Sequence, residues 1–262
     1  YHVFSTDDMV HWTDHGEILN SSQVPWGRKE GGFMWAPDCA YKNGTYYFYF
    51  PHPSETNWDN SWKIGVATSC RPAEGFEVKG YIEGMDPLID PCVFVDDNGQ
   101  AYIYNGGGGI CKGGKLKDNM MELDGLMQPM EGLEDFHEAT WVHKYNGKYY
   151  MLSSGCTGWD PNIAEIAVAD SIMGTWKTIG NPCTGPDADK TFYAQSTYVQ
   201  PVVGKKNAYI AMFDRWKKKD LEDSRYVWLP VLIKDRAITI PWHEKWDLTV
   251  FDKQKKSDKQ KK

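Results

Sequence analysis

The sequence has little that would place the protein in a membrane or on nucleic acid. It has no run of about 18 apolar residues, which excludes a membrane-spanning helix. Acidic residues outnumber basic ones by 36 to 29, and the net charge of −7 argues against a nucleic-acid partner, which requires a basic face. None of the six cysteines stands in a C-x-x-C pair, so we expect no zinc or thioredoxin-type motif and predict free, mostly buried thiols.

Helical periodicity is also scarce, and short β-branched and aromatic runs are separated by Gly, Asn, Asp and Pro. The 12 Trp and 15 Tyr suit both a large β core and stacking on sugar rings, and composition does not choose between them. One domain is expected over 1–250, followed by a charged, disordered tail over 251–262. The charged stretch 215–225 is interpreted as a solvated loop.

Because the chain opens on Tyr1 rather than Met, we expect a processed or truncated piece. An extracellular or periplasmic location is expected, with its signal outside the chain.

Two units recur along the chain. The first is an alternating strand, a turn and a Tyr-rich strand, found at 36–50, 90–104, 138–152 and 195–212. Three of its four turns carry Asn-Gly, the strongest short hairpin signal. The second unit is a strand, a turn and a strand with Trp or Phe closed by Gly, found at 2–16, 64–80 and 166–180 and, more weakly, at 113–125 and 229–246.

Alternation of the two units gives four-stranded blades of about 50 residues, a period typical of β-propellers. Five copies of the second unit against four of the first predict an all-β, five-bladed propeller whose first blade is incomplete at the N-terminus. A β-sandwich would not explain a repeat at this spacing.

The repeat aligns four residues at the start of the first strand in successive blades. Eight positions before the turn Asn stand Trp35, Asp90 and Glu138, and the flanking strands match Gln195 in the fourth unit. Since the first strand of a propeller blade lines the central channel, we expect these side chains to converge. A single acid at a strand start often only caps an edge or binds solvent, but acids recurring at one register favour a site.

Two carboxylates, an amide and a Trp around one opening suit glycoside hydrolysis. One carboxylic acid protonates the leaving oxygen, and the other carboxylate activates water or attacks the sugar. A neighbouring Asp keeps the acid protonated near neutral pH, because like charges disfavour ionisation.

Four stretches together resemble glycoside hydrolase family 43, the five-bladed propeller arabinanases, xylosidases and arabinofuranosidases: 1–16, "WAPD" (35–38), "LIDPCVFVDDNGQAYIY" (88–104) and "FHEATWVHKYNGKYY" (136–150). The resemblance implies that Glu138 is the general acid and that Asp90 tunes it and orients substrate. It also implies an inverting mechanism with a separate base Asp, in a strand that would precede this chain. Asp7 and Asp8 come after that strand, in a turn, and are poor substitutes.

The second half, at 153–183, 191–202 and 223–231, looks more like the galactanase-like branch of the family. That likeness makes Gln195 either a ligand of substrate or water, or a stand-in base. An amide is a weak base, so the second role would need special proton transfer.

Three further residues are candidates for substrate binding. Trp35 would stack on a sugar, Trp159 in the loop "GCTGWDP" would form a second platform, and His137 adjoins the acid. Neighbouring residues on a strand point to opposite faces, so the alternative role of His137 is to shape a loop. Calcium occurs at the channel centre in parts of the family, but no Asp-x-Asp-x-Asp-Gly loop is present, and we predict no metal ligands and no cofactor.

The sequence therefore predicts an inverting glycoside hydrolase acting on arabinose-, xylose- or galactose-containing glycans of plant cell walls. Its partner would be an oligo- or polysaccharide. The alternative is a sugar-binding propeller that keeps the pocket but lacks the general base.

Overall fold

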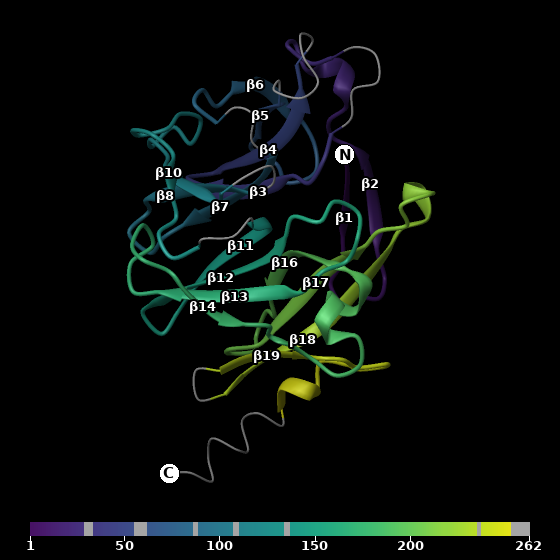
Figure 1. Ribbon diagram of the computed structural model, residues 1–262. Helices are drawn as coiled ribbons and strands as arrows, with labels where there is room; N and C mark the ends of the chain where they lie inside the picture. The colour runs from purple at the N-terminus through teal and green to yellow at the C-terminus, as the bar shows by residue number, and fades with distance from the viewer. Residues whose placement is uncertain are drawn as a thin grey trace. The chain divides into compact units, whose positions relative to one another are not determined.

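A computed structural model of the chain describes residues 1–28, 34–54, 62–85, 89–106, 110–133, 137–234 and 237–252 (Figure 1). The chain divides into two compact units, Tyr1–Met130 and Glu131–Lys262, and the single domain expected over 1–250 stays a prediction. Regular structure is mainly strand, and the short 3-10 segments are η1 (Ser21–Gln23), η2 (Ala188–Tyr193) and η3 (Leu221–Asp223). In the described part of the chain, no helix has the length and hydropathy needed to span a membrane.

The first unit holds two four-stranded antiparallel sheets and a separate hairpin. The hairpin pairs β1 (His2–Ser5) with β2 (Thr13–Glu17). One sheet contains β3 (Asp38–Lys42), β4 (Thr45–Pro53), β5 (Trp62–Ser69) and β6 (Glu77–Tyr81) in that order. The other contains β7 (Ile89–Val95), β8 (Ala101–Gly106), β9 (Lys112–Lys115) and β10 (Gln128–Pro129), also in chain order.

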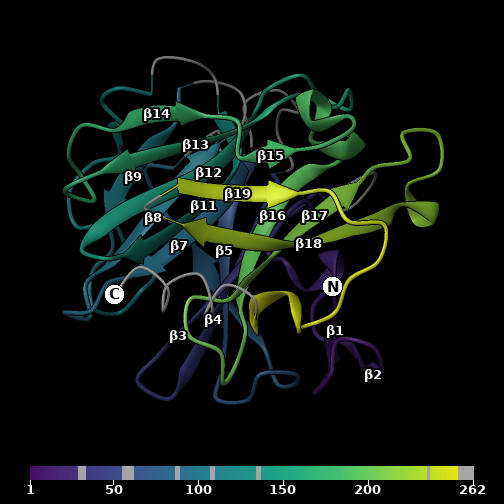
Figure 2. The same cartoon turned by 90° about the horizontal axis from the view of Figure 1, so that it is seen from below.

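The second unit holds two more sheets. One contains β11 (His137–Tyr145), β12 (Lys148–Gly155), β13 (Ala164–Ala169) and β14 (Lys177–Gly180). The other has the order β15-β19-β18-β17-β16 and contains β15 (Cys183–Thr184), β16 (Gln195–Pro201), β17 (Tyr209–Arg215), β18 (Arg225–Lys234) and β19 (Ala237–Pro241). Figure 2 shows β15 alongside β19, to which it pairs in parallel. The sequence did not predict this two-residue strand.

Asn-Gly turns close the inner hairpins of two sheets as predicted. Asn43 and Asn146 have φ values of 51° and 49°, and the glycines after them have φ values of 83° and 75°. Both residues of a type I′ turn need φ > 0, which Asn and Gly tolerate best. The turn between β7 and β8 is longer, because the last ladder pair before it is Val95 with Ala101.

This longer turn corrects the predicted alignment by one residue. A bulge separates the pairs Glu138–Ser154 and Trp141–Leu152 in β11–β12. The matching bulge in β7–β8 lies between the pairs Ile89–Gly106 and Cys92–Tyr104. Ile89, not Asp90, therefore matches Glu138, and Asp90 takes the bulge position with a φ of 50°. Gln195 does match Glu138, because each lies three residues before the first regular pair after the bulge, Tyr198–Met212 in β16–β17 and Trp141–Leu152 in β11–β12.

Each unit has a core that joins its own two sheets. In the first unit Tyr49, Ile64 and Ile103 are fully buried, and in the second Leu152 and Phe213 are at most 2% exposed. Burying a side chain of this size contributes about 1.5–3 kcal/mol. The strand alternation seen in the sequence thus supplies the cores that hold the sheets together.

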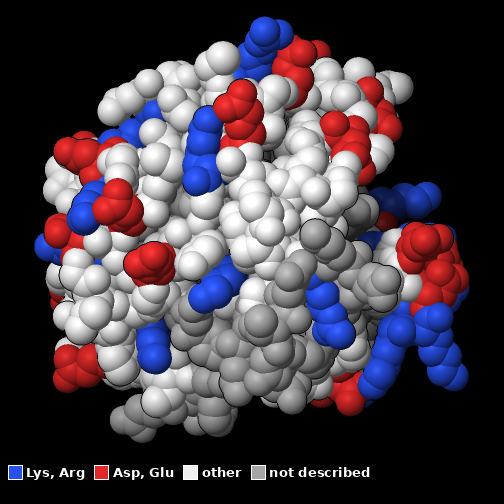
Figure 3. Space-filling model, turned by 90° about the horizontal axis from the view of Figure 1, so that it is seen from above, with Lys and Arg blue, Asp and Glu red and all other residues white. Residues whose placement is uncertain are grey.

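The chain end and the cysteines also bear on the predictions. The predicted tail starts at 251, but Phe251 is 3% exposed and packs edge-on against Trp246, while 253–262 lie outside the described residues. None of the six cysteines forms a disulfide, and three of them are buried. On the face drawn in Figure 3, acidic and basic side chains are interspersed.

Candidate active site

Glu138 is the second residue of β11 and lies beside a bulge. The pair Glu138–Ser154 flanks the bulge, and Ala139 follows with a φ of 52°. Bulges re-aim side chains at the ends of strands and recur beside active sites. Glu138 is therefore a carboxylate at a position where the sheet does not bury it, and it is partly exposed.

Gln195, the first residue of β16, binds Glu138 directly. Its Nε2 donates to Glu138 Oε1 at 2.9 Å and to Ser154 Oγ at 3.0 Å. Its Oε1 accepts the indole N–H of Trp216 at 3.2 Å. The structure thus brings together two of the predicted site residues and adds Ser154 and Trp216, which the sequence did not single out.

A pocket of about 300 Å³ opens at Gln195. Two aromatic side chains, Trp159 and Trp216, line it and meet edge to face with ring centroids 5.4 Å apart. Each is 37% exposed, so a ligand has access to an aromatic surface. The predicted platform Trp159 therefore lies in one pocket with Gln195.

A left-handed turn forms another part of the pocket wall. Thr191, Phe192 and Tyr193 have φ values of 49°, 59° and 58° in succession, and Tyr193 lines the pocket. This conformation costs a residue other than glycine about 1–2 kcal/mol. Two hydrogen bonds hold the turn, from Thr191 Oγ1 to the carbonyl of Asn162 at 2.7 Å and from Arg215 to the carbonyl of Phe192 at 2.6 Å. Such strain clusters at functional sites.

Charged groups flank Gln195 on β17. Asp214 pairs with Gln195 across the ladder, and burial raises the pKa of Asp214, although a hydrogen bond with Thr197 opposes the shift. Arg215 lines the pocket, and its guanidinium stacks 6.0 Å from the ring centre of Trp242.

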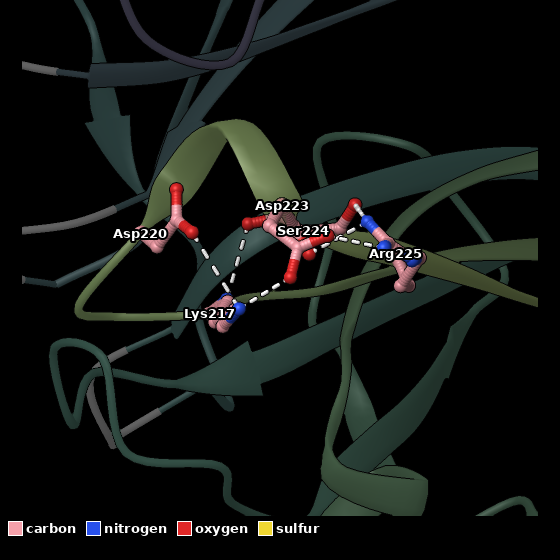
Figure 4. A network of polar contacts seen from close by, with 5 residues as sticks. All are labelled: Lys217, Asp220, Asp223, Ser224 and Arg225. Atoms are coloured by element: carbon pink, nitrogen blue, oxygen red, sulfur yellow. Dashed lines mark hydrogen bonds and ion pairs between the residues drawn. The ribbon is translucent and has the colours of Figure 1, made fainter.

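The predicted solvated loop 215–225 divides into two parts. Its first two residues, Arg215 and Trp216, line the pocket, contrary to the prediction. From Lys217 onward the segment is exposed and bound by its own ion pairs, as predicted (Figure 4). Because basic residues follow Trp216 directly, the sequence pattern indicated a solvated loop and not a residue of the pocket wall.

His137 is buried beside the acid, and its predicted role in substrate binding stays a prediction. It is 3% exposed, its Nδ1 lies 2.9 Å from Ser153 Oγ, and Glu165 is 3.9 Å away. Adjacent strand residues face opposite sides, so a Glu138 side chain turned toward Gln195 leaves His137 on the buried side. His137 supports the sheet beneath the acid.

Trp35 and Asp90 belong to the first unit. Trp35 precedes β3, stacks on Trp62 with ring centroids 4.5 Å apart, and its carbonyl accepts the hydroxyl of Tyr1 at 2.6 Å. Asp90 is the second residue of β7. The convergence of both residues with Glu138 and Gln195 stays a prediction.

The described residues contain no group of three or more His, Cys, Asp or Glu side chains able to hold a metal ion.

Comparisons with known proteins agree on one family. The model of the glycosyl hydrolases family 43 matches residues 1–211. A xylosidase/arabinosidase 43A from Humicola insolens is 36% identical over 208 residues, which cover 59% of this chain and 60% of that protein. The chain therefore spans less than two thirds of this relative's length.

Solved structures are similar over nearly the whole chain. A family 43 β-1,3-galactosidase with galactodeoxynojirimycin has a TM-score of 0.83 at 28% identity and covers 94% of this chain and 86% of that one. An exo-β-1,3-galactanase from Clostridium thermocellum has a TM-score of 0.80 at 25% identity, covering 92% of this chain and 55% of that one. With the four sheets of blade type, these likenesses show that the chain has an all-β propeller fold and belongs to glycosyl hydrolase family 43.

Proposed function

We propose that the protein is an inverting glycosidase that releases a neutral sugar from a plant cell-wall glycan, with β-1,3-linked galactose as the first candidate. The contact between Glu138 Oε1 and Gln195 Nε2, 2.9 Å long at the edge of a pocket lined with Trp, carries the proposal. A carboxylic acid beside aromatic faces suits a substrate that has a leaving oxygen to protonate and apolar C–H faces to stack.

Each residue has a distinct role in this proposal. Glu138 donates the proton to the leaving oxygen, and Trp159 and Trp216 stack on the sugar. Gln195 Oε1 accepts one indole N–H and keeps a second lone pair, with which it binds the attacking water or a sugar hydroxyl. Asp90 keeps the role that the family resemblance gives it, orienting the substrate, and Trp35 keeps its predicted role of stacking on a sugar.

Two kinds of relatives bear on the sugar. The similar structures are described as a β-1,3-galactosidase and an exo-β-1,3-galactanase, whereas the curated relative is a xylosidase/arabinosidase. The Gln at the pocket, a residue resembling the galactanase-like branch, favours galactose. Xylose and arabinose are the competing outcomes of the same assay.

The test compares substrates that differ in their need for an acid. The native chain, Glu138→Gln and the control Glu165→Gln are assayed on β-1,3-galactan, xylan, arabinan and aryl galactosides. On galactan, Glu138→Gln should lose about 10²–10⁴-fold in kcat, the usual contribution of a general acid. On a dinitrophenyl galactoside, whose leaving group needs no proton, the loss should be much smaller. Glu165 contacts His137 outside the pocket lining, so Glu165→Gln should keep its activity.

Product stereochemistry and binding complete the test. Early-time NMR should detect the anomer opposite to that of the substrate. An equal loss on both kinds of substrate would reject Glu138 as the acid. Calorimetric sugar binding without turnover on any substrate would favour the alternative, a sugar-binding propeller.

A further inference from the structure

The amide of Gln195 has one orientation that satisfies all its neighbours. An indole N–H can only donate, so the atom facing Trp216 Nε1 at 3.2 Å must be the carbonyl oxygen. The NH₂ group then faces Glu138 Oε1 and Ser154 Oγ, at 2.9 Å and 3.0 Å. With the amide reversed, NH₂ would oppose the indole N–H, two donors with no acceptor between them.

This orientation decides where the acid can carry its proton. Glu138 Oε1 accepts a hydrogen from Gln195 Nε2, so in the protonated acid the hydrogen resides on Oε2. With the amide reversed, the carbonyl of Gln195 would face Glu138 and accept the acid's own O–H. That proton would then be held between Glu138 and Gln195 rather than offered to a leaving oxygen.

We propose that Trp216 is a positioning residue whose indole N–H holds the Gln195 amide with its NH₂ toward Glu138, and so keeps the acid's proton on the oxygen that faces away from Gln195. This inference rests on the proposed function of Glu138.

Two sets of contacts keep the Trp216 ring in place. Trp159 meets it edge to face at 82° on the pocket side. The segment directly after it is closed by Lys217, whose backbone N–H donates to Ser224 Oγ at 3.0 Å and whose ammonium binds Asp220 and Asp223 (Figure 4). One ring contact and the anchored segment after Trp216 thus restrain the indole, as a group that orients another must be restrained.

The decisive variant is Trp216→Phe, which keeps an aromatic ring and removes the N–H. On galactan, kcat should fall about two- to tenfold, the factor that one neutral hydrogen bond controls, with KM changed less than kcat. The basic limb of the pH–rate profile should move to higher pH, because a reversed amide accepts from the protonated acid and no longer donates to the carboxylate. The other charged groups nearby, Asp160, Asp214 and Arg215, are the same in every variant.

Two controls separate positioning from packing. Trp246→Phe removes an indole N–H that donates to the carbonyl of Trp228 at 2.8 Å outside the pocket lining, and it should leave the pH profile unmoved. In a Gln195→Leu background there is no amide to orient, so adding Trp216→Phe should cause no further shift of the basic limb.

The pH–rate profiles test the inference about Trp216, and turnover by Glu138→Gln tests the proposed function separately. A basic limb that stays in place in Trp216→Phe, or moves equally in the Gln195→Leu background, overturns the inference. Unchanged turnover in Glu138→Gln overturns the proposed function instead. If the native chain turns over none of the glycans, ¹⁵N NMR of the Trp216 indole still decides. Its chemical shift should titrate with Glu138 in the native chain but not in Glu138→Gln or Gln195→Leu. A chemical shift that is independent of pH in the native chain refutes the proposed link from Trp216 through Gln195 to Glu138.

Discussion

Asp38, the first residue of β3, is a carboxyl whose ionisation is coupled to folding. Its Oδ2 accepts the backbone N–H of Val93 in β7 at 2.6 Å, and its Oδ1 accepts that of Cys39 at 2.7 Å. Burial raises the pKa of Asp38 from 3.8 to about 7, although the two N–H donors act in the opposite direction. Over that interval the folded protein holds a proton that the unfolded chain has released.

The sign follows from the raised pKa of the folded state. The contribution of Asp38 to stability is fully present below pH 3.8 and is lost as the pH rises through about 7. At 1.36 kcal/mol per pKa unit, the whole loss is about 4 kcal/mol, of which about 3 kcal/mol falls between pH 5 and pH 8.

Urea denaturation of the native chain and of Asp38→Asn, followed by Trp fluorescence at constant ionic strength, measures this loss. Asn is neutral at every pH, so the difference between the two free energies of unfolding isolates the carboxyl. From pH 5 to pH 8 the native chain should lose about 3 kcal/mol relative to the variant. A constant difference would refute the reasoning, and a native chain that gains stability would mean that the N–H donors outweigh burial.

Three further predictions concern single contacts. Ser154→Ala removes one acceptor of the Gln195 amide and should lower kcat on galactan about two- to tenfold, and an unchanged kcat would remove Ser154 from the site. Gly132→Ala should destabilise the protein far more than Gly147→Ala in urea denaturation. Both glycines have positive φ, but of the two only Gly132 has a backbone atom in the way of a Cβ, the Trp176 carbonyl oxygen at 2.0 Å. Equal losses of unfolding free energy in the two variants would contradict this reasoning. Lys217→Ala should leave the urea midpoint unchanged at 0.15 M salt, because Lys217 and its two charged partners, Asp220 and Asp223, are all solvated. A clear drop would show that these ion pairs are stronger than their exposure implies.

The repeat made much of this fold predictable. Asn-Gly at 43–44 and 146–147 marks the turns, and alternation beside them marks the paired strands, so local chemistry and global fold agree. The prediction for Asp90 was off by one because its Asn98 lies in a longer turn, whose extra length the letters Asn-Gly do not reveal. The count of five blades stays a prediction.

Contacts between distant residues were predictable only where the repeat relates the residues. Gln195 and Glu138 are 57 positions apart, and the repeat register related them correctly. Trp216 follows a strand and precedes three lysines, so only the fold reveals that its indole faces Gln195. The left-handed turn at 191–193 is built from residue types that avoid that conformation, and their partners on distant segments enforce it.

The parallel pairing of β15 with β19 has a consequence for synthesis of the chain. Cys183 pairs with Ile240 and Thr184 with Pro241, so the last strand of the final sheet joins a segment made 57 residues earlier. At about 5–20 residues per second, a ribosome takes about 3–11 s to make that interval. During that time β15 has no partner strand, and β18, once it has been made, exposes an unpaired edge until β19 follows. An unpaired edge is a template for pairing with other chains. The nascent second unit is therefore most exposed to aggregation just before its C-terminal strand emerges.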